Sequence, residues 1–485
     1  MRSHAAITAS VAAVLALLSV SVPARCLTAS RPQSSVSAPE PPATSAETVS
    51  EVLEGPWSGK ISVGQTELTL VFNFAVSDDG SISVTLDSPD QGAEGIEAEC
   101  DAAALPMLRV NVPSLLASYS GILYGGNIVG TFSQGGLSLP LTLTKGESRL
   151  RRPQTPRPPY PYVTEDVSFR GGSPEVTLAG TISYPSGYSA SAPVGSAVPA
   201  ATAASTASTA QDGKTTVSDN TAPVAVVMVS GSGLQDRDEQ IFGHRPFLVI
   251  ADYLARNGIA SLRYDDRGFG ESTGAESVGT ATTEDFMQDA LAAVEYLRGT
   301  GRFSRIGVLG HSEGANIAFM LGALGKVDFV ISLAGIGVKG DEALTAQVNR
   351  IAELSGQKVE LSVEDFRRSA LMQNQPWLSW FIDYDPTADI SGTACPVMAV
   401  NGSLDSQVIP SLNLGAIREK LPGGSGDGMS GAKNFVKEYA SLNHLFQHCT
   451  TGAPTEYRGI EETVSEELLA DIAAWIREIG PTASW

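Results

Sequence analysis

The sequence predicts an α/β domain, with a mostly parallel sheet flanked by helices, preceded by a small antiparallel all-β domain. Two patterns predict these two parts. Apolar and polar residues alternate strictly within residues 52–146, as in half-buried antiparallel strands. Short, almost wholly apolar runs separated by helical patterns follow over residues 164–485, as in strands buried on both faces of a parallel sheet.

The composition narrows the classes of function. The chain has 485 residues, and at about 150 residues per domain this is roughly three domain-equivalents. Hydrophobic residues make up 42% and charged residues 18%, so the chain can bury a sizeable core. The net charge of −21 argues against nucleic-acid or anionic-lipid partners, because long-range repulsion opposes both. The four cysteines are too few for a disulfide scaffold and match no zinc-ligand spacing.

The N-terminal residues predict export to the periplasm or the outside of the cell. Arg2 precedes an uncharged run that ends with small residues at Val22-Pro23-Ala24, so we expect a signal peptide over residues 1–24 that is removed near Ala24. An uncleaved membrane anchor is one alternative. Lipidation at Cys26 is another, which Arg25 disfavours. Residues 25–51, rich in Ser, Pro, Ala and Thr, predict a flexible tether, and no other segment is long enough to span a membrane.

The all-β domain is expected over residues 52–146. Alternating apolar residues run from Leu68 to Val76 and, after the Asp78-Asp79-Gly80 turn, from Ile82 to Leu86, which indicates a hairpin. A Pro-rich linker at 147–163 follows it and carries Arg149, Arg151, Arg152 and Arg157. A solvated basic linker that docks on an acidic neighbour is favoured there over a polyanion site.

The α/β domain is expected over residues 164–485. Its buried strands are predicted at residues 224–229, 259–264, 306–309, 329–333, 397–400 and 435–440. An amphipathic helix begins at Thr282, with Asp285 in the place of a capping box. Residues 186–221, rich in Ala, Ser and Thr, interrupt the pattern and predict a disordered surface insertion between two early strands.

Two stretches match the pattern G-x-S-x-G, in which a serine nucleophile sits on a sharp turn between a buried strand and a helix. The stretch around Ser312 has both neighbours, with the apolar run 306–309 before it and the apolar run 315–321 after it. The stretch around Ser272 is separated from its strand by polar residues and leads into another loop. The context therefore predicts Ser312 as the nucleophile and Ser272 as a coincidental match.

A serine nucleophile of this kind needs an acid and a histidine, which follow it in that order along the chain. The sharp turn that carries Ser312 is called a nucleophile elbow. Of the five histidines, only His444 and His448 come after this elbow in the chain. His444 almost directly follows a predicted strand, whereas His448 fits a helix-surface residue, and no carboxylate or thiolate pattern supports a metal site formed by the pair. Asp405 is the first carboxylate after the strand 397–400, which predicts a Ser312–Asp405–His444 triad.

The predicted chemistry is nucleophilic attack on a carbonyl. Ser312 attacks, His444 takes its proton, and Asp405 orients the imidazole and stabilises its charged form. The oxyanion that forms needs two backbone N–H donors. We expect one from Glu313, directly after the nucleophile, and one from Ser232 or Gly233 in the turn after the first central strand, where glycine also serves a tight connection. No cofactor and no metal are expected.

Four motifs resemble those of exported bacterial α/β-hydrolases, namely carboxylesterases and serine aminopeptidase-like or prolyl-oligopeptidase-like relatives. The motifs are the stretches 231–238, 263–268, 310–314 and 443–447. The resemblance covers about residues 55–480, because some members also carry an N-terminal β domain before a Pro-rich linker. It implies the α/β-hydrolase fold. This chain departs from the family in its insertion at 186–221 and in Leu234, where proline is usual.

The stretch at about residues 336–393 is where α/β-hydrolases place a helical lid. It contains an aromatic cluster that includes Trp377, Trp380 and Phe381. These side chains are candidates for a substrate pocket, and packing of the lid onto the body is the competing interpretation.

Three functions remain in competition. The first is hydrolysis of small, short-acyl carboxylic esters. The second is a serine exopeptidase, for which the charged run 236–239 is the candidate anchor of a peptide terminus. The third is a surface-binding protein with a vestigial hydrolase domain, against which the intact Ser312, Asp405 and His444 argue. Free thiols are favoured over a Cys395–Cys449 disulfide, and the oligomeric state does not follow from the sequence.

Overall fold

The computed structural model describes residues 52–63, 66–77, 81–89, 93–104, 106–146, 152–188, 223–358, 360–423 and 434–479. These residues form two compact units: 52–146 with 241–243, and 152–240 with 244–479. The predicted signal peptide, the tether, Cys26, the turn at 78–80 and most of the predicted insertion lie outside the described residues. No helix within the described ranges is long and apolar enough to cross a bilayer.

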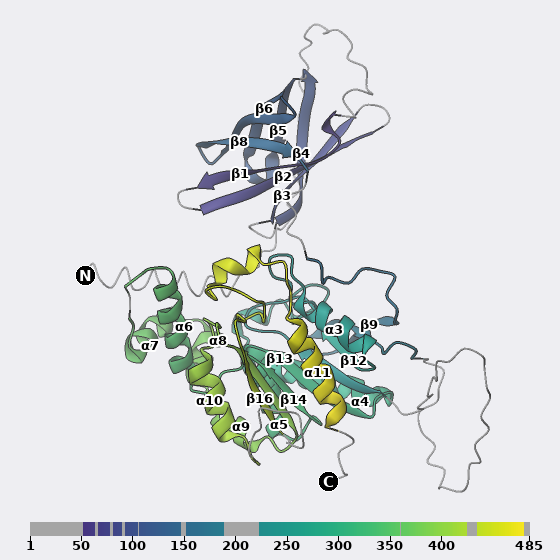
Figure 1. Ribbon diagram of the computed structural model, residues 1–485, viewed down its shortest axis with the longest axis vertical. Helices are drawn as coiled ribbons and strands as arrows, with labels where there is room; N and C mark the ends of the chain where they lie inside the picture. The colour runs from purple at the N-terminus through teal and green to yellow at the C-terminus, as the bar shows by residue number, and fades with distance from the viewer. Residues whose placement is uncertain are drawn as a thin grey trace, which may run out of the picture. The chain divides into compact units, whose positions relative to one another are not determined.

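The first unit is a closed antiparallel barrel (Figure 1). Its elements are β1 (Gly55–Val63), β2 (Thr66–Val76), β3 (Ile82–Ser88), β4 (Ala93–Ala104), β5 (Met107–Val112), η2 (Pro113–Leu115), β6 (Ala117–Tyr124), β7 (Asn127–Gln134) and β8 (Leu137–Lys145). Each strand pairs with the next, and β8 pairs back with β1. The alternation predicted antiparallel strands, and the closure is what the structure adds.

Two features account for the closed barrel. Gly59 on β1 approaches β8 so closely that a Cβ atom there would lie 2.2 Å from the carbonyl oxygen of Thr142. The interior is filled by large side chains, among them Trp57, Phe72 and Tyr119. The Tyr119 hydroxyl lies 2.9 Å from the carbonyl oxygen of Ile128, which satisfies this polar group inside an apolar core.

The second unit is a mixed sheet covered by helices. Its strands are β9 (Thr164–Arg170), β10 (Thr177–Ser183), β11 (Val224–Val229), β12 (Ala260–Tyr264), β13 (Arg305–His311), β14 (Val330–Leu333), β15 (Val397–Gly402) and β16 (Phe435–Tyr439). The spatial order is β16-β15-β14-β13-β11-β12-β10-β9. All pairings from β12 to β16 are parallel, and β10 runs antiparallel to both its neighbours. This confirms the mostly parallel sheet that the apolar runs predicted.

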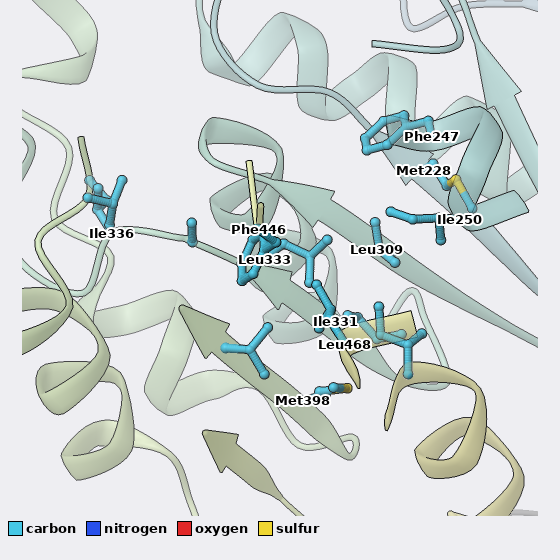
Figure 2. Packing of buried hydrophobic residues seen from close by; sticks show 14 of the residues in the cluster. Met228, Phe247, Ile250, Leu309, Ile331, Leu333, Ile336, Met398, Phe446 and Leu468 are labelled. Atoms are coloured by element: carbon cyan, nitrogen blue, oxygen red, sulfur yellow. The ribbon is translucent and has the colours of Figure 1, made fainter. Parts of the chain in front are cut away.

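Helices lie on both faces of this sheet (Figure 1). They are α3 (Pro246–Arg256), η3 (Val278–Thr280), α4 (Thr283–Thr300), α5 (Glu313–Ala323), α6 (Gly340–Leu354), α7 (Val363–Leu371), α8 (Pro376–Phe381), α9 (Thr387–Gly392), α10 (Pro410–Lys420), η4 (Pro454–Gly459) and α11 (Glu466–Glu478). Alternate residues of the strands point to opposite faces, so each face builds its own core. Met228 and Leu309 pack with α3 and α11 residues such as Ile250 and Leu468 (Figure 2), whereas Val308 packs with α4 and α5 on the other face.

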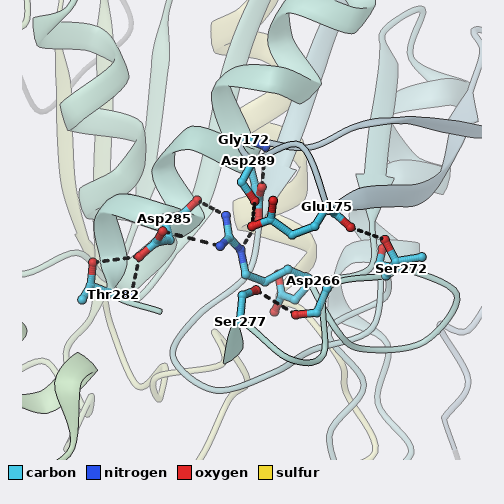
Figure 3. Close-up of polar contacts among 12 residues, drawn as sticks. Gly172, Glu175, Asp266, Ser272, Ser277, Thr282, Asp285 and Asp289 are labelled. Carbon is cyan, nitrogen blue, oxygen red and sulfur yellow. Dashed lines mark hydrogen bonds and ion pairs between the residues drawn. The ribbon is translucent and has the colours of Figure 1, made fainter. Parts of the chain in front are cut away.

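Helix α4 shows how local sequence sets an element. Thr282 is its N-cap, and the Asp285 carboxylate accepts a hydrogen bond of 2.9 Å from the Thr282 backbone N–H (Figure 3). The predicted capping box is therefore confirmed. Arg267, in the loop after β12, donates to Asp289 on the same helix at 2.6 Å, and both side chains are buried. This pair ties α4 to the end of the sheet where β12 finishes.

The structure bears on three further predictions, which concern the linker, the lid region and the disulfide. Arg152 of the linker donates to the carbonyl oxygens of Ile460 and Arg458 at 2.8 Å, so this part of the linker docks on the α/β unit. Helices α6 to α9 occupy the stretch where a lid was predicted. Cys100, Cys395 and Cys449 are free, so the Cys395–Cys449 disulfide is absent from the described residues.

Candidate active site

Ser312 lies between β13 and α5, where the sequence predicted a nucleophile elbow. It is the N-cap of α5, with φ 54° and ψ −118°, a strained backbone for a residue that carries a Cβ. Gly310 and Gly314, on either side of Ser312, must be glycine because no space is left for a Cβ atom at either position. A Cβ on Gly310 would lie 1.9 Å from the carbonyl oxygen of Gly314, and one on Gly314 would lie 2.1 Å from that of Val229. The pattern G-x-S-x-G thus reflects how tightly the turn is packed.

Ser272 has a different setting. Its hydroxyl donates to the carbonyl oxygen of Asp265 at 2.7 Å and accepts the backbone N–H of Ala179 at 2.9 Å. It lies in a loop (Figure 3), not between a strand and a helix. Both hydrogen bonds serve the backbone, which explains this serine without a catalytic role.

The structure brings Asp405 and His444 together from loops 39 positions apart. Asp405 follows β15, and His444 follows β16. The Asp405 Oδ2 atom lies 2.7 Å from His444 Nδ1, and both side chains are buried. The other carboxylate oxygen accepts the backbone N–H groups of Gln407 and Val408, which fixes its orientation. Among the described residues, no hydrogen bond joins the Ser312 hydroxyl to His444.

His448 does not lie on a helix, so that part of the sequence interpretation is wrong. Residues 440–450 form turns and a short bridge between Leu442 and His448. The His448 ring is 59% exposed, and its Nδ1 atom lies 2.8 Å from Glu462 Oε2. The tight turn arises because Asn443 caps it, accepting the backbone N–H groups of Leu445 and Gln447.

The turn after β11 approaches the elbow. A Cβ on Gly231 would lie 3.2 Å from the Cβ of Ser312. The Gly231 N–H donates to Glu239 Oε1 at 3.0 Å. In contrast, none of the N–H groups of Ser232, Gly233 and Glu313 donates to an acceptor within the described part of the chain. All three N–H donors that the sequence predicted for an oxyanion thus lack an acceptor among the described residues.

Glu313 also contributes its side chain, a feature that the sequence did not indicate. The carboxylate is buried and accepts hydrogen bonds from the hydroxyl of Thr283 at 2.6 Å and the indole N–H of Trp377 at 2.8 Å. It also bonds the Ser232 side chain. Burial raises the pKa of Glu313 above its ordinary value, and these hydrogen bonds oppose the rise. One carboxyl group therefore connects the elbow, α4, α8 and the turn after β11.

The three predicted pocket aromatics have different surroundings. Trp377 reaches the elbow through its bond to Glu313. Phe381 is buried in the core and stacks on the Trp377 ring with centroids 5.2 Å apart. Trp380 stacks on Tyr384 at 5.1 Å. Of the three, Trp377 is the one whose side chain bonds a residue next to Ser312.

The loop that carries His444 is supported from behind by a buried polar network. Gln447 accepts from Asn443 at 3.0 Å and donates to the carbonyl oxygen of Glu462 at 2.9 Å. Its amide nitrogen also lies 3.0 Å from His244 Nε2. Burial, followed by the charge of Arg152, lowers the pKa of His244 to about 4, so this imidazole is neutral at pH 7.

The charged run 236–239 is engaged in contacts within the protein. Arg237 forms a salt bridge of 2.7 Å with Asp265. Asp238 pairs with Arg263, and Asp236 accepts the backbone N–H groups of Asp238 and Gln240. Glu239 accepts from Gly231, as described above. All four side chains are thus occupied in bracing the turn after β11 and its surroundings.

Known proteins resemble this chain in the α/β unit. Residues 245–381 match the family model described as "Serine aminopeptidase, S33". Esterase EstD of Thermotoga maritima is 28% identical over 278 residues, which cover 54% of this chain. The chain spans 65% of the length of that relative.

Solved structures were compared as well. An esterase of Pyrococcus furiosus aligns over 69% of this chain and 100% of its own, with a TM-score of 0.41 and 16% identity. Est1E of Butyrivibrio proteoclasticus aligns over 57% of this chain and 90% of its own, with a TM-score of 0.34 and 14% identity.

The family model and the Thermotoga relative agree with the motifs read from the sequence. The predicted resemblance is confirmed: the chain is similar to carboxylesterase and serine aminopeptidase-like α/β-hydrolases.

Proposed function

We propose that this protein is a serine hydrolase that cleaves small carboxylic esters, with Ser312 as nucleophile and Asp405–His444 as its acid–base pair. The observation that carries the proposal is the 2.7 Å contact between the Asp405 carboxylate and His444 Nδ1, in a loop next to the strained Ser312 elbow. A carboxylate on Nδ1 fixes the tautomer whose Nε2 lone pair can accept a proton. The name of the Thermotoga relative, an esterase, supports the same chemistry.

The proposed reaction has two halves. Ser312 Oγ attacks the ester carbonyl while His444 takes its proton, and the alcohol leaves with that proton as the acyl-enzyme forms. Water then attacks the acyl group with His444 as base, which releases the acid and restores Ser312. The free N–H groups of Glu313 and of Ser232 or Gly233 stabilise the oxyanion in each half.

The engaged charges at residues 236–239 favour esters over peptides. An exopeptidase needs a charged group that anchors the terminus of its substrate, and this run was the candidate anchor in the sequence. Arg237 and Asp238 neutralise Asp265 and Arg263 instead. An ester with a good leaving group needs the nucleophile, the base and the oxyanion donors, but no such anchor.

The substrate pocket is proposed to lie beside Trp377. Its indole is held by Glu313, the residue after the nucleophile, and is braced from behind by Phe381. A ring fixed at this position limits the length of the acyl group, which supports a short-acyl preference. Helices α6 to α9 then act as the lid of the site.

The test is a comparison of two substrates of matched acyl size. We expect kcat/KM for p-nitrophenyl butyrate to exceed that for an aminoacyl p-nitroanilide after correction for the intrinsic reactivity of each leaving group. Activity on the ester should disappear in Ser312→Ala and persist in Ser272→Ala. If the anilide is the better substrate after correction, the protein is a peptidase instead. If neither is cleaved, the hydrolase proposal is wrong.

A further inference from the structure

His311, the residue before the nucleophile, lies where three loops of the site meet. Its Nδ1 atom is 2.8 Å from Glu239 Oε1, and its Nε2 atom is 3.0 Å from the backbone carbonyl oxygen of His444. The ring is buried. Its centroid is 4.7 Å from that of the His444 ring. His311 thus contacts both the side chain and the backbone of the residue assigned as the base.

The two partners of His311 determine its protonation state. A carboxylate oxygen and a carbonyl oxygen both accept hydrogen bonds, and neither can donate one. A neutral imidazole carries one N–H and one lone pair, so one of its nitrogens would face an oxygen lone pair inside the protein. Only the doubly protonated ring satisfies both contacts. A buried cation also gives the buried Glu239 carboxylate a counter-charge, without which it would be costly.

Glu239 extends this contact to the turn after β11. The oxygen that contacts His311 also accepts the Gly231 N–H at 3.0 Å. Glu239 has a φ of 53°, an uncommon backbone conformation for a residue other than glycine, and its side chain is only 7% exposed. The backbone of Glu239 is therefore held in an energetically unfavourable conformation. This conformation places the side chain where it contacts both His311 and the Gly231 N–H.

We propose that His311 is an imidazolium that forms an ion pair with Glu239. This ion pair fixes the positions of the turn after β11, the elbow and the His444 loop relative to one another, as catalysis requires. The pair lies beside Asp405–His444, with the two histidine ring centroids 4.7 Å apart, and acts through it. The inference rests on the proposed function for its catalytic consequence, but the charge of His311 is a property that can be measured without a substrate.

The charges around His311 set the expected response to pH. Glu239 and Asp405 are the carboxylates that face it, His444 lies beside it, and the edge of Phe446 covers the ring. Burial lowers the pKa of His311, but the charge and hydrogen bond of Glu239, the His444 carbonyl and the charge of Asp405 together raise it above its ordinary value. Below that pKa both N–H bonds are present. As the pH rises through it, one bond and the counter-charge of Glu239 are lost.

The first experiment measures the proton on His311 directly. The full chain, labelled with ¹⁵N in histidine, is examined by two-bond ¹H–¹⁵N correlation spectroscopy at pH 7, and the rings are assigned by removing each histidine in turn. We expect both nitrogens of His311 to carry a proton. A neutral His311 ring at pH 7 would overturn the proposal. This measurement does not depend on hydrolytic activity, so it separates this inference from the proposed function.

The second experiment measures the catalytic consequence with Glu239→Gln, which keeps the shape of the side chain and removes its charge. We expect kcat for p-nitrophenyl butyrate to fall by about 10²-fold with little change in KM, because the variant misplaces groups that act on bound substrate. The alkaline limb of the pH–kcat profile should also move to lower pH, since His311 loses the anion that keeps it protonated. An effect on packing alone would lower kcat without moving that limb.

The matched control is His448, which pairs with Glu462 at the same 2.8 Å but on the surface. His448→Gln removes a histidine–glutamate contact without touching the three loops, and it should leave kcat and the pH profile unchanged. An unshifted alkaline limb in folded Glu239→Gln, or an equal shift in His448→Gln, would contradict the positioning role. If Glu239→Gln does not fold, the protonation of His311 in the wild-type chain decides the question.

Discussion

At Ser312 the fold supports an uncommon backbone conformation with closely packed neighbours. The φ of 54° exposes the serine at the end of β13, and Gly310 and Gly314 let the turn close on itself. In the proposed mechanism, negative charge develops beside the N-terminus of α5, whose dipole stabilises it. The conformation of the proposed nucleophile therefore depends on the close packing of its neighbours.

Gly314→Ala should damage the elbow. The added Cβ would lie 2.1 Å from the carbonyl oxygen of Val229, which is backbone that cannot move freely. We expect a loss of about 1–3 kcal/mol in the free energy of unfolding and a large loss of kcat. Denaturant unfolding and ester hydrolysis measure the two effects.

Gly279→Ala is the control, because a Cβ at that position meets nothing within 4 Å. It should change the free energy of unfolding by no more than about 0.5 kcal/mol. Equal effects at the two positions would show that steric crowding at the elbow is not the cause.

His244 should make the protein less stable in acid. Its pKa is about 4 in the folded protein, below the ordinary 6.5, because it is buried and lies near Arg152. As the pH falls from 6.5 to 4, the unfolded chain binds a proton that the folded chain does not, so folding loses up to about 3 kcal/mol through this group. The penalty is absent above pH 6.5 and complete below pH 4.

The measurement compares denaturant unfolding of wild type and His244→Gln between pH 7 and pH 4. The glutamine variant is expected to lose less stability than wild type over this range, whatever its stability at pH 7. His448→Gln, which removes an exposed histidine, should retain the wild-type slope. Parallel curves for wild type and His244→Gln would rule out this role for His244.

At the residue scale, the sequence predicted which loops carry Ser312, Asp405 and His444, because the ends of parallel strands meet at one edge of a sheet. It did not predict that Glu239 and His311 contact each other. Their bond joins residues 72 positions apart, and His311 looked in the sequence like a mere member of the elbow. Contacts of this kind depend on the three-dimensional arrangement of loops, which no local pattern encodes.

At the scale of elements, α8 is connected to the elbow by one side-chain bond. The Trp377 indole donates to Glu313, which also accepts from Thr283 on α4. The position of α8 relative to α5 therefore depends on a buried carboxyl group next to the proposed nucleophile. The proposed acyl pocket therefore depends on the ring of Trp377 more directly than on the rest of the inserted helices.

Trp377→Ala should open the acyl pocket. We expect the ratio of kcat/KM for p-nitrophenyl octanoate over the butyrate to rise by about tenfold, since removal of a large ring admits additional methylene groups. Trp377→Phe keeps most of the ring and loses the N–H, so it should change this ratio far less. An unchanged ratio in Trp377→Ala would place the acyl pocket elsewhere.

The strands and helices of the α/β unit were largely predictable. Residues 224–229 form β11 as expected, and Thr282 caps α4 as expected. Apolar runs and capping residues are local signals, so the elements that they predict do not depend on contacts with distant parts of the chain. The turn containing His448 was misread as helix because an i,i+4 spacing of histidines resembles a helical face, whereas the Asn443 side chain closes a turn there.

At the scale of the whole molecule, the chain divides into two units with separate cores. The barrel core around Trp57 and Tyr119 shares no member with the two cores of the α/β unit. The barrel was predicted as antiparallel strands, but its closure was not, because closure depends on the contact of β8 with β1 across more than 80 positions. All candidate site residues lie in the α/β unit.

The α/β unit should therefore fold and act without the barrel. We expect a chain of residues 152–485 to unfold cooperatively and to retain kcat/KM for p-nitrophenyl butyrate within about threefold of the full chain, because the proposed machinery and its supporting cores are all retained. Circular dichroism and ester hydrolysis test this. Loss of activity in a folded 152–485 chain would assign the barrel a part in catalysis.

The central claim is that Ser312 is the nucleophile of a serine hydrolase. The most direct measurement treats the full chain with a fluorophosphonate probe and identifies the modified peptide by mass spectrometry. The account predicts a single phosphonylated serine at Ser312, labelling that is abolished in Ser312→Ala, and labelling that persists in Ser272→Ala. Modification of Ser272, or labelling that survives the loss of Ser312, would contradict it.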